Sequence, residues 1–388
     1  MAAPASGPAP AERYYPALDG LRAVATAAVL ISHFYPDRSS IHRAFHWGRF
    51  GVMLFFVLSG FLITGLLLRG RDAVAAGGVT RGAVFRAFMA RRALRIAPIY
   101  YLAVLLGWAA SYGPISNYIL WHLTYTGNIA LTYFNHPMAQ ATHLWSLCVE
   151  EQFYLLWPLA VLFVPPKRLA LVASSLVVFS FGYEVLGVLQ GRTPEQTHLV
   201  LQGCMDALGL GALLAICFQR DARRGGSSAE ALSLYASMVG APLFFFAQGY
   251  RYEVGISATD RLPYRIAGDI GLALMSLSLV YLATTRGTSL IRRFLELPPL
   301  RFLGRISYGI YLYHLFLIAI GRWVARTYEM EELRRGHTMF LLYGAISIVL
   351  ATISWYALEA PISRQKKRFP YPPRPTRALG EGADAPAS

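Results

Sequence analysis

Long runs of apolar residues, separated by short polar and basic segments, dominate the pattern of this chain. A helix needs about 20 apolar residues to cross a bilayer, and many stretches here are long enough. The runs are too long and too continuous for the strands of a membrane barrel. We therefore predict an all-α, polytopic integral membrane protein with about ten transmembrane helices. These are expected at residues 17–36, 50–68, 96–112, 144–164, 169–189, 199–218, 229–249, 266–285, 306–325 and 338–358.

The segments outside these runs complete the domain organisation. Residues 117–134 are moderately apolar but contain polar side chains, so we expect a re-entrant or interfacial piece there. Residues 1–13, rich in Ala and Pro, predict a disordered lead, and residues 366–388 predict a disordered basic cytoplasmic tail. Residues 14–365 would form a single transmembrane domain. We expect neither a cleaved signal peptide nor a second, soluble domain.

The charge distribution sets the expected orientation. The net charge of +15 would suggest nucleic acid as a partner of a soluble protein, but here the basic residues lie between apolar runs. With the N-terminus in the cytoplasm, 25 of the 36 Lys and Arg residues fall on the cytoplasmic side. We therefore predict that both termini are cytoplasmic and that nucleic acid is not a partner. The three cysteines show no disulfide or metal-ligand spacing, so no metal site is predicted.

Two polar residues share one face of the first apolar run. A charged residue inside a span costs about 2.5–3.5 kcal/mol on insertion scales, so it needs a reason. Arg22 and His33 lie eleven residues apart, which is close to three helical turns, or about 16 Å along the axis. The structural alternatives are a snorkelling Arg22 and an interhelical hydrogen bond from His33. The shared face favours a functional site.

Arginines and glutamates follow in the third and fourth runs. Arg92 and Arg95 are three residues apart and share a helix face, and guanidinium groups suit phosphate oxygens. Lipid headgroups or the positive-inside bias would explain them equally well. Glu150 and Glu151 are adjacent, so they point about 100° apart and cannot both face one site. We expect one of them to lie at the depth of His33, where a carboxylate would orient the imidazole as a base.

Further intramembrane polar residues are expected to have structural partners. The preferred interpretation of His314 is a hydrogen bond between packed helices. Each of the remaining acidic residues inside the runs is expected to pair with an intramembrane arginine or another polar group. These acidic residues are Glu184, Asp206 and Asp269.

Several stretches, in this order and spacing, resemble the acyltransferase 3 family of membrane acyltransferases. They are LDGLRAVA followed by His33, FFVLSGFLIT at 55–64, RRALRIAPIYY at 91–101, HLWSLCVEEQFYLLWP at 143–158 and LGRISYGIYLYHLF at 303–316. The family includes O-acetylases of bacterial surface polysaccharides and acylases of macrolide antibiotics. The resemblance covers residues 14–365. Some members carry a C-terminal SGNH-type hydrolase-like domain, which we expect this chain to lack.

The resemblance also implies roles for individual residues. The family pattern of a basic residue, ten others and a histidine matches Arg22 and His33. Its RxxR pattern matches Arg92 and Arg95, and the glutamate of its SLxVE segment matches Glu150. By this resemblance the arginines would hold the acyl-CoA donor, and His33 and Glu150 would take part in transfer.

Together these observations predict an acyl-CoA-dependent O-acyltransferase in the bacterial cytoplasmic membrane. It would move an acyl group, with acetyl-CoA the favoured donor, to a hydroxyl of a sugar-containing acceptor such as a cell-envelope polysaccharide or glycolipid. Its partners would be acyl-CoA, the glycosylated acceptor and membrane lipids. One alternative is the acylation of a secreted small molecule such as a macrolide. A transporter and a non-catalytic membrane receptor are the others, and the residues leave open whether a covalent acyl intermediate forms.

Overall fold

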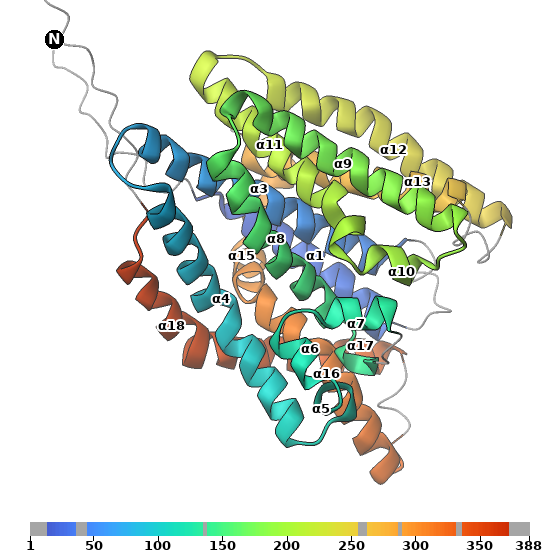
Figure 1. The fold of residues 1–388 in the computed structure, drawn as a ribbon. Coiled ribbons are helices and arrows are strands. Elements are labelled where there is room, and N and C mark those ends of the chain that lie inside the picture. The colour runs from blue at the N-terminus through green and yellow to red at the C-terminus, as the bar shows by residue number, and fades with distance from the viewer. Residues whose placement is uncertain are drawn as a thin grey trace, which may run out of the picture.

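The computed structural model describes residues 14–35, 45–134, 138–254, 262–285, 289–330 and 336–371, and all of its regular structure in these ranges is helical. Figure 1 shows a bundle of long helices joined by shorter helical pieces. The long helices are α1 (Pro16–Phe34), α3 (Trp47–Ala75), α4 (Arg81–Ala109), α8 (Leu144–Phe163), α9 (Pro166–Leu189), α11 (Met205–Arg224), α12 (Ser228–Val254), α13 (Leu262–Thr284), α16 (Ser307–Thr327) and α17 (Gly336–Ser354).

Nine helices in the described part of the chain are long and apolar enough to cross a membrane. The prediction of a polytopic, all-α membrane protein is therefore confirmed, and nine of the predicted spans coincide with these helices. Nine agrees with the prediction of about ten, and one predicted span has no counterpart among these helices. The span predicted at 96–112 is the apolar second half of α4, whose first half carries five arginines and is too polar to qualify.

Short helices connect the long ones. The predicted non-spanning segment 117–134 contains α6 (Ile119–Leu123) and α7 (Gly127–Tyr133), neither of which is long enough to span. The remaining short elements are α5 (Gly113–Ser116), η1 (Ala139–Ala141), α10 (Pro194–His198), η2 (Leu201–Cys204), α14 (Leu290–Leu295) and α15 (Pro298–Arg305). Beyond α17 the chain continues through the π-helical turn η5 (Trp355–Glu359), α18 (Ala360–Arg364) and η6 (Gln365–Arg368).

Helix α3 lies at the centre of the bundle. It packs against α1, α11, α13 and α8, and 72% of its spanning window is buried. Helices α9 and α12 lie at the periphery in Figure 1, and only 22% and 28% of their windows are buried. Their exposed residues include Leu171, Val178, Phe245 and Phe246. Apolar side chains on the outside of a polytopic protein are those expected to face lipid.

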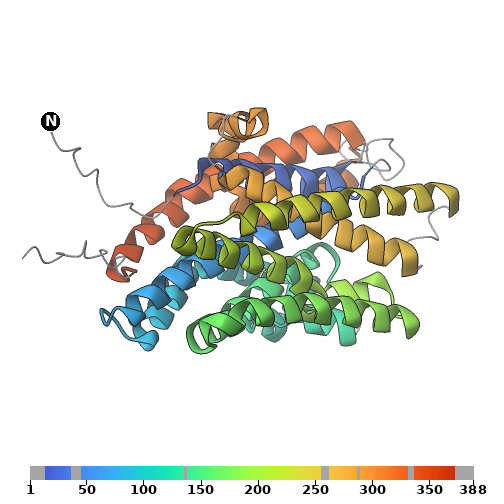
Figure 2. The ribbon, with the colours of Figure 1, turned by 90° about the horizontal axis from the view of Figure 1, so that it is seen from above.

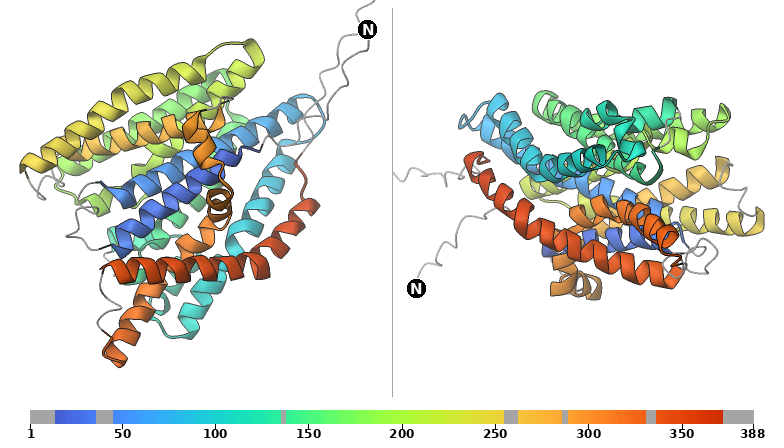
Figure 3. Two further views of the ribbon diagram at one scale, coloured as in Figure 1. Left: turned by 180° about the vertical axis from the view of Figure 1, so that it is seen from behind. Right: turned by 90° about the horizontal axis from the view of Figure 1, so that it is seen from below.

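The turn between α3 and α4, which Arg71 and Arg81 flank, and the C-terminal end of the described chain lie on the same side. Seen from above in Figure 2 and from below in Figure 3, the turn between α3 and α4 and the end of α18 lie toward one end of the bundle. Arg91 Nη1 donates to the Lys366 carbonyl oxygen at 3.1 Å. This placement agrees with a shared side for these two basic segments. That the side is cytoplasmic remains a prediction from the charge distribution.

Two glycines allow α14 and α15 to approach the start of α1. A Cβ on Gly304 would overlap the backbone of Asp19, and a Cβ on Gly20 would overlap the backbone of Leu295. Only residues without a side chain permit helices to pack this closely. The contact fixes the first turns of α1, from which Arg22 projects.

Candidate active site

One narrow cavity brings together four of the five predicted site residues. Its volume is about 80 Å³, and it lies among α1, α3, α4, α8 and α16. We call it the arginine cavity. Its polar lining comprises Arg22, Ser59, Arg92, Arg95, Ser146, Glu150, Tyr154, Ser307, Tyr308 and Tyr311.

The arginines of this cavity differ in how their charge is balanced. Arg22 pairs with Asp19 in the same helix, with Nη1 and Oδ1 2.9 Å apart. Arg92 lies over the ring of Tyr154, 5.1 Å from its centroid. Among the described residues no carboxylate lies within ion-pair distance of Arg92 or Arg95. Two guanidinium groups that make no ion pair among the described residues form a site suited to an anion, and their forked donors fit phosphate oxygens.

Glu150 is held by hydroxyl groups inside the same cavity. Ser59 Oγ donates to Glu150 Oε1 at 2.6 Å, and the hydroxyl oxygens of Ser59 and Tyr154 are 3.1 Å apart. The neighbouring Glu151 does not line this cavity, and its Oε1 is buried without a hydrogen-bond partner among the described residues. The structure thus separates the two adjacent carboxylates, as the angle between successive helical residues requires.

His33 lies in a second cavity. This cavity has a volume of about 240 Å³ and includes Val29, Gly48, Arg49, Thr142, His143, Glu195 and His198 in its lining. We call it the histidine cavity. The structure does not bring Glu150 to His33 as predicted, because Glu150 accepts from Ser59 Oγ and no hydrogen bond or ion pair joins it to His33 among the described residues. Two residues at the same depth in the membrane need not be in contact, because depth does not determine which way each side chain points around its helix.

A second histidine orients His33. His314 is fully buried, and its Nδ1 lies 2.6 Å from the Tyr311 carbonyl oxygen, so Nδ1 carries the hydrogen of the neutral ring. His314 Nε2 then accepts from His33 Nδ1, 3.0 Å away. This pairing places the lone pair of a neutral His33 on Nε2. The prediction of an interhelical hydrogen bond for His314 is confirmed, and its partner is the site histidine itself.

The two cavities meet at Val52 and Tyr311, which line both of them. The Tyr311 hydroxyl lies 2.6 Å from Ser146 Oγ and donates to the His143 carbonyl oxygen at 3.1 Å. Neither Tyr311 nor Ser146 was among the predicted site residues. Each lies within a motif that the prediction did use, and Tyr311 precedes His314 by three residues, so the two share a helix face.

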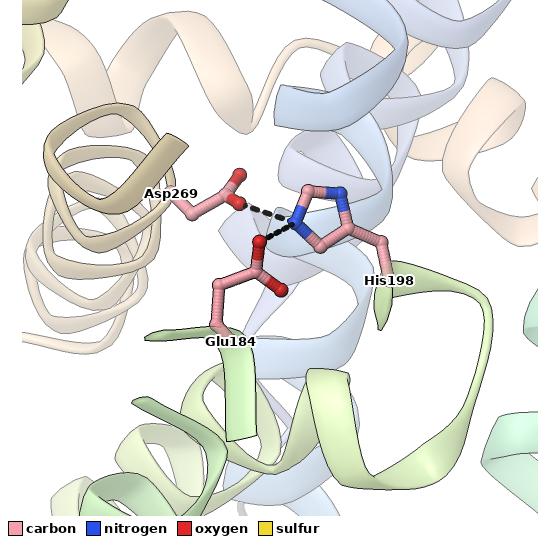
Figure 4. A group of neighbouring side chains, drawn as sticks. All are labelled: Glu184, His198 and Asp269. Carbon is pink, nitrogen blue, oxygen red and sulfur yellow. Dashed lines mark ion pairs between the residues drawn. The ribbon is translucent and has the colours of Figure 1, made fainter. Parts of the chain in front are cut away.

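A group of charged residues lies beside the histidine cavity (Figure 4). His198 Nε2 lies 2.8 Å from Asp269 Oδ2 and 3.1 Å from Glu184 Oε1. Arg49 Nε pairs with Asp269 at 2.8 Å, and Arg265 pairs with Glu184. The predicted pairing is therefore confirmed for Glu184 and Asp269. Asp206 differs, because its Oδ1 is buried without a hydrogen-bond partner among the described residues.

Comparison with protein families identifies the class of protein to which this geometry belongs. The model of the acyltransferase domain of the acyltransferase 3 family matches residues 15–360. The chain therefore belongs to the acyltransferase 3 family and is a multi-pass membrane protein. No solved structure matches this chain.

Curated relatives are distant in sequence but match across most of this chain. It is 28% identical over 379 residues to YrhL of Bacillus subtilis, whose name assigns it provisionally to peptidoglycan O-acetylation. It is 25% identical over 386 residues to the O-acetyltransferase OatA of Staphylococcus aureus and 26% identical over 383 residues to the peptidoglycan O-acetyltransferase OatA of Listeria monocytogenes. These alignments cover 91%, 93% and 91% of this chain, but 55%, 59% and 56% of the relatives. The chain thus spans somewhat more than half of their length.

Proposed function

We propose that this protein is a membrane-bound O-acyltransferase that moves an acetyl group from acetyl-CoA to a hydroxyl of a cell-envelope glycan. The observation that carries the proposal is a pair of cavities that meet at Val52 and Tyr311. One presents guanidinium groups, and the other presents a histidine whose Nε2 carries a lone pair. An acyl transfer between two large substrates needs such a pair of approaches to one reacting carbon.

The arginine cavity is the donor side. The phosphates of CoA carry several negative charges, and Arg92 and Arg95 supply forked donors that make no ion pair among the described residues. A volume of about 80 Å³ is far below that of a typical ligand pocket, so the nucleotide would remain at the mouth. Only the extended pantetheine arm and a short acyl group would pass inward. This narrowness supports acetyl rather than a long acyl chain.

The histidine cavity is the acceptor side. The acceptor hydroxyl gives its proton to His33 Nε2 as its oxygen attacks the thioester carbonyl carbon. A new carbon–oxygen bond forms, the carbon–sulfur bond breaks, and the CoA thiolate leaves with the bond's electron pair. The proton on His33 then passes to the thiolate, which restores the neutral histidine. His314 acts as a positioning residue, because its Nε2 accepts the hydrogen of His33 Nδ1.

Glu150 belongs to the donor side in this scheme. Its carboxylate lies in the same cavity as Arg92 and Arg95 and is fixed by Ser59. We propose that it sets the position of the donor arm and of the arginine side chains, rather than the orientation of His33. The relatives named for peptidoglycan O-acetylation support a cell-envelope glycan as the acceptor over a secreted small molecule.

The test is the release of free CoA thiol by the purified full-length protein in nanodiscs. The protein would receive acetyl-CoA and a panel of peptidoglycan fragments, other envelope saccharides and glycosylated macrolides. We expect release that depends on a glycan acceptor and is lost in His33→Ala. Release with macrolides alone would overturn the proposed acceptor class. Folded protein that releases no thiol with any acceptor, but moves a saccharide across the bilayer without a donor, would replace the proposal with transport.

A further inference from the structure

Arg49 lies where the histidine cavity meets two neighbouring cavities. Arg49 and His198 line all three of them. Asp269 holds the Nε edge of the Arg49 guanidinium at 2.8 Å, and within the described parts of the chain the two terminal amino groups pair with no carboxylate. A guanidinium fixed at one edge is pre-organised, so it loses little conformational entropy when its other donors bind a ligand.

The charged group behind Arg49 is better suited to an anion than to a metal ion. Atoms of Glu184, His198 and Asp269 lie close enough together to hold a cation. However, Arg265 already pairs with Glu184 and Arg49 with Asp269, so a divalent cation would meet two guanidinium groups. Because like charges repel strongly in a partly buried site, cation binding is disfavoured.

His198 adds positive charge beside Arg49. Burial lowers the pKa of His198, as does the nearby Arg49, but the carboxylates of Asp269 and Glu184 outweigh both and raise it overall. Asp206, a further carboxylate of this region, lines a neighbouring cavity and not the histidine cavity. Arg49 and His198 therefore line the histidine cavity, whereas the two carboxylates that pair with them, Asp269 and Glu184, do not.

The start of α3 reinforces this charge. Gly48 and Arg49 lie in its first turn, and both line the histidine cavity. The first N–H groups of a helix have no partners within it, and the helix dipole places partial positive charge there. At the rim Glu195 is exposed, where its carboxylate could accept hydrogen bonds from sugar hydroxyls.

We propose that Arg49, held by Asp269 and flanked by His198, binds an oxyanion group on the saccharide acceptor and thereby places a nearby hydroxyl at His33. The ligand class is a saccharide that carries a carboxylate or a phosphate. This inference rests on the proposed function only in calling the bound saccharide an acceptor. The binding site itself does not depend on acyl transfer. No residue of the arginine cavity takes part in it.

The experiment measures equilibrium binding by calorimetry to the full-length protein in nanodiscs, without any acyl donor. The probes are N-acetylmuramic acid, its carboxamide and N-acetylglucosamine 6-phosphate. We expect the acid to bind about 10- to 100-fold more tightly than the carboxamide, because one hydrogen-bonded charge contact is worth that much. Tighter binding of the phosphate than of the acid would assign the site to phosphorylated saccharides. Equal binding of acid and amide, with no gain for the phosphate, would overturn the inference.

Three variants at two arginines separate recognition from folding. Arg49→Gln should remove the preference for the charged probe. Arg265→Gln removes the other arginine of the same charged group, which does not line the histidine cavity, and should keep the preference. Arg49→Lys retains a charge beside Asp269 but loses the fork, so it should fold and still lose most of the preference. A preference that survives in both Arg49 variants would also overturn the inference.

The outcomes distinguish this inference from the proposed function. Arg49-dependent binding without any thiol release would leave an anionic-saccharide site and remove acyl transfer. Acceptor-dependent thiol release that is equal for acid and amide, in the wild type and in Arg49→Gln, would leave acyl transfer and remove the site.

Discussion

The arginines of the two cavities are balanced in opposite ways. In the arginine cavity, Arg92 and Arg95 have no carboxylate within ion-pair distance among the described residues, and Arg92 rests on the ring of Tyr154. Beside the histidine cavity, Arg49 and Arg265 each pair with a carboxylate of a neighbouring helix. Both regions bury guanidinium groups within a membrane protein, where an uncompensated charge is costly.

This difference in ion pairing indicates what kind of ligand each cavity suits. Within the described parts of the chain Arg92 and Arg95 make no ion pair, and Glu150, the carboxylate of the same cavity, is held by Ser59 rather than by either arginine, so both arginines are stabilised when a polyanion arrives. Arg49 and Arg265 each have a carboxylate partner, so they need no ligand to balance their charge. The terminal amino groups of Arg49 are the donors that would bind a single anionic group. A highly charged donor therefore suits the first cavity, and an acceptor with one charge and many hydroxyls suits the second.

The largest expected effect comes from replacing His33, the proposed general base. His33→Ala should lower kcat by about 10²- to 10⁴-fold, the usual contribution of a general base, while the KM for acetyl-CoA stays unchanged. The measurement is thiol release at saturating acceptor. His337→Ala is the matched control, since this histidine pairs with Tyr35 and does not line the histidine cavity. Wild-type kcat in His33→Ala would remove His33 from the mechanism.

The next effect tests the donor cavity. Arg95→Gln should raise the KM for acetyl-CoA by about 10- to 100-fold through the loss of a charge-assisted contact. S-acetylpantetheine, which lacks the nucleotide phosphates, should be used equally well by the variant and the wild type. Arg86→Gln changes the same charge on the exposed part of α4 and should have no effect. A loss that is equal for both donors would show that Arg95 does not contact phosphate.

A smaller effect is expected from the histidine pair. His314→Leu removes the acceptor of the His33 Nδ1 hydrogen and should lower kcat about 10-fold without changing either KM, which is the scale of one hydrogen bond. His314→Gln keeps an acceptor oxygen and should restore part of the loss. If Leu and Gln reduce kcat alike, or if KM changes instead, then His314 contributes packing rather than orientation.

The smallest effect concerns stability. Gly304→Ala places a methyl group against the Asp19 backbone and should destabilise the fold by about 1–3 kcal/mol, the usual cost of overpacking. Gly182→Ala is the control, because a Cβ at this exposed position in α9 meets nothing within 4 Å. Thermal unfolding in detergent compares the two. An unchanged melting temperature in Gly304→Ala would mean that α15 can move away from α1.

Much of this architecture could be predicted from the sequence. Apolar runs identify spanning helices because the bilayer leaves a segment few alternatives to a helix. Motif spacing likewise placed Arg92 and Arg95 on one face, and they line one cavity with Arg22. The span expected at 96–112 is not among the nine because α4 combines an arginine-rich half with an apolar half that is short.

The partners of individual side chains could not be predicted in the same way. Glu150 was expected beside His33 on the basis of depth, but the rotation of α8 turns it toward Ser59 instead. His314 lies 281 residues from its partner, and only the packing of α16 against α1 joins them. Arg49 could have been singled out from the sequence, because it lies at the start of an apolar run, where a charged residue is costly.

We propose that the arginine cavity receives the acyl donor and the histidine cavity receives the acceptor, from different directions. Proteoliposomes with the glycan acceptor trapped inside and radiolabelled acetyl-CoA added outside test this most directly. We predict that label appears in the trapped acceptor while the vesicles stay sealed, that Arg95→Gln slows its appearance at limiting acetyl-CoA, and that His33→Ala lowers it by about 10²- to 10⁴-fold. Label found only in acceptor on the same side as the acetyl-CoA would contradict the account.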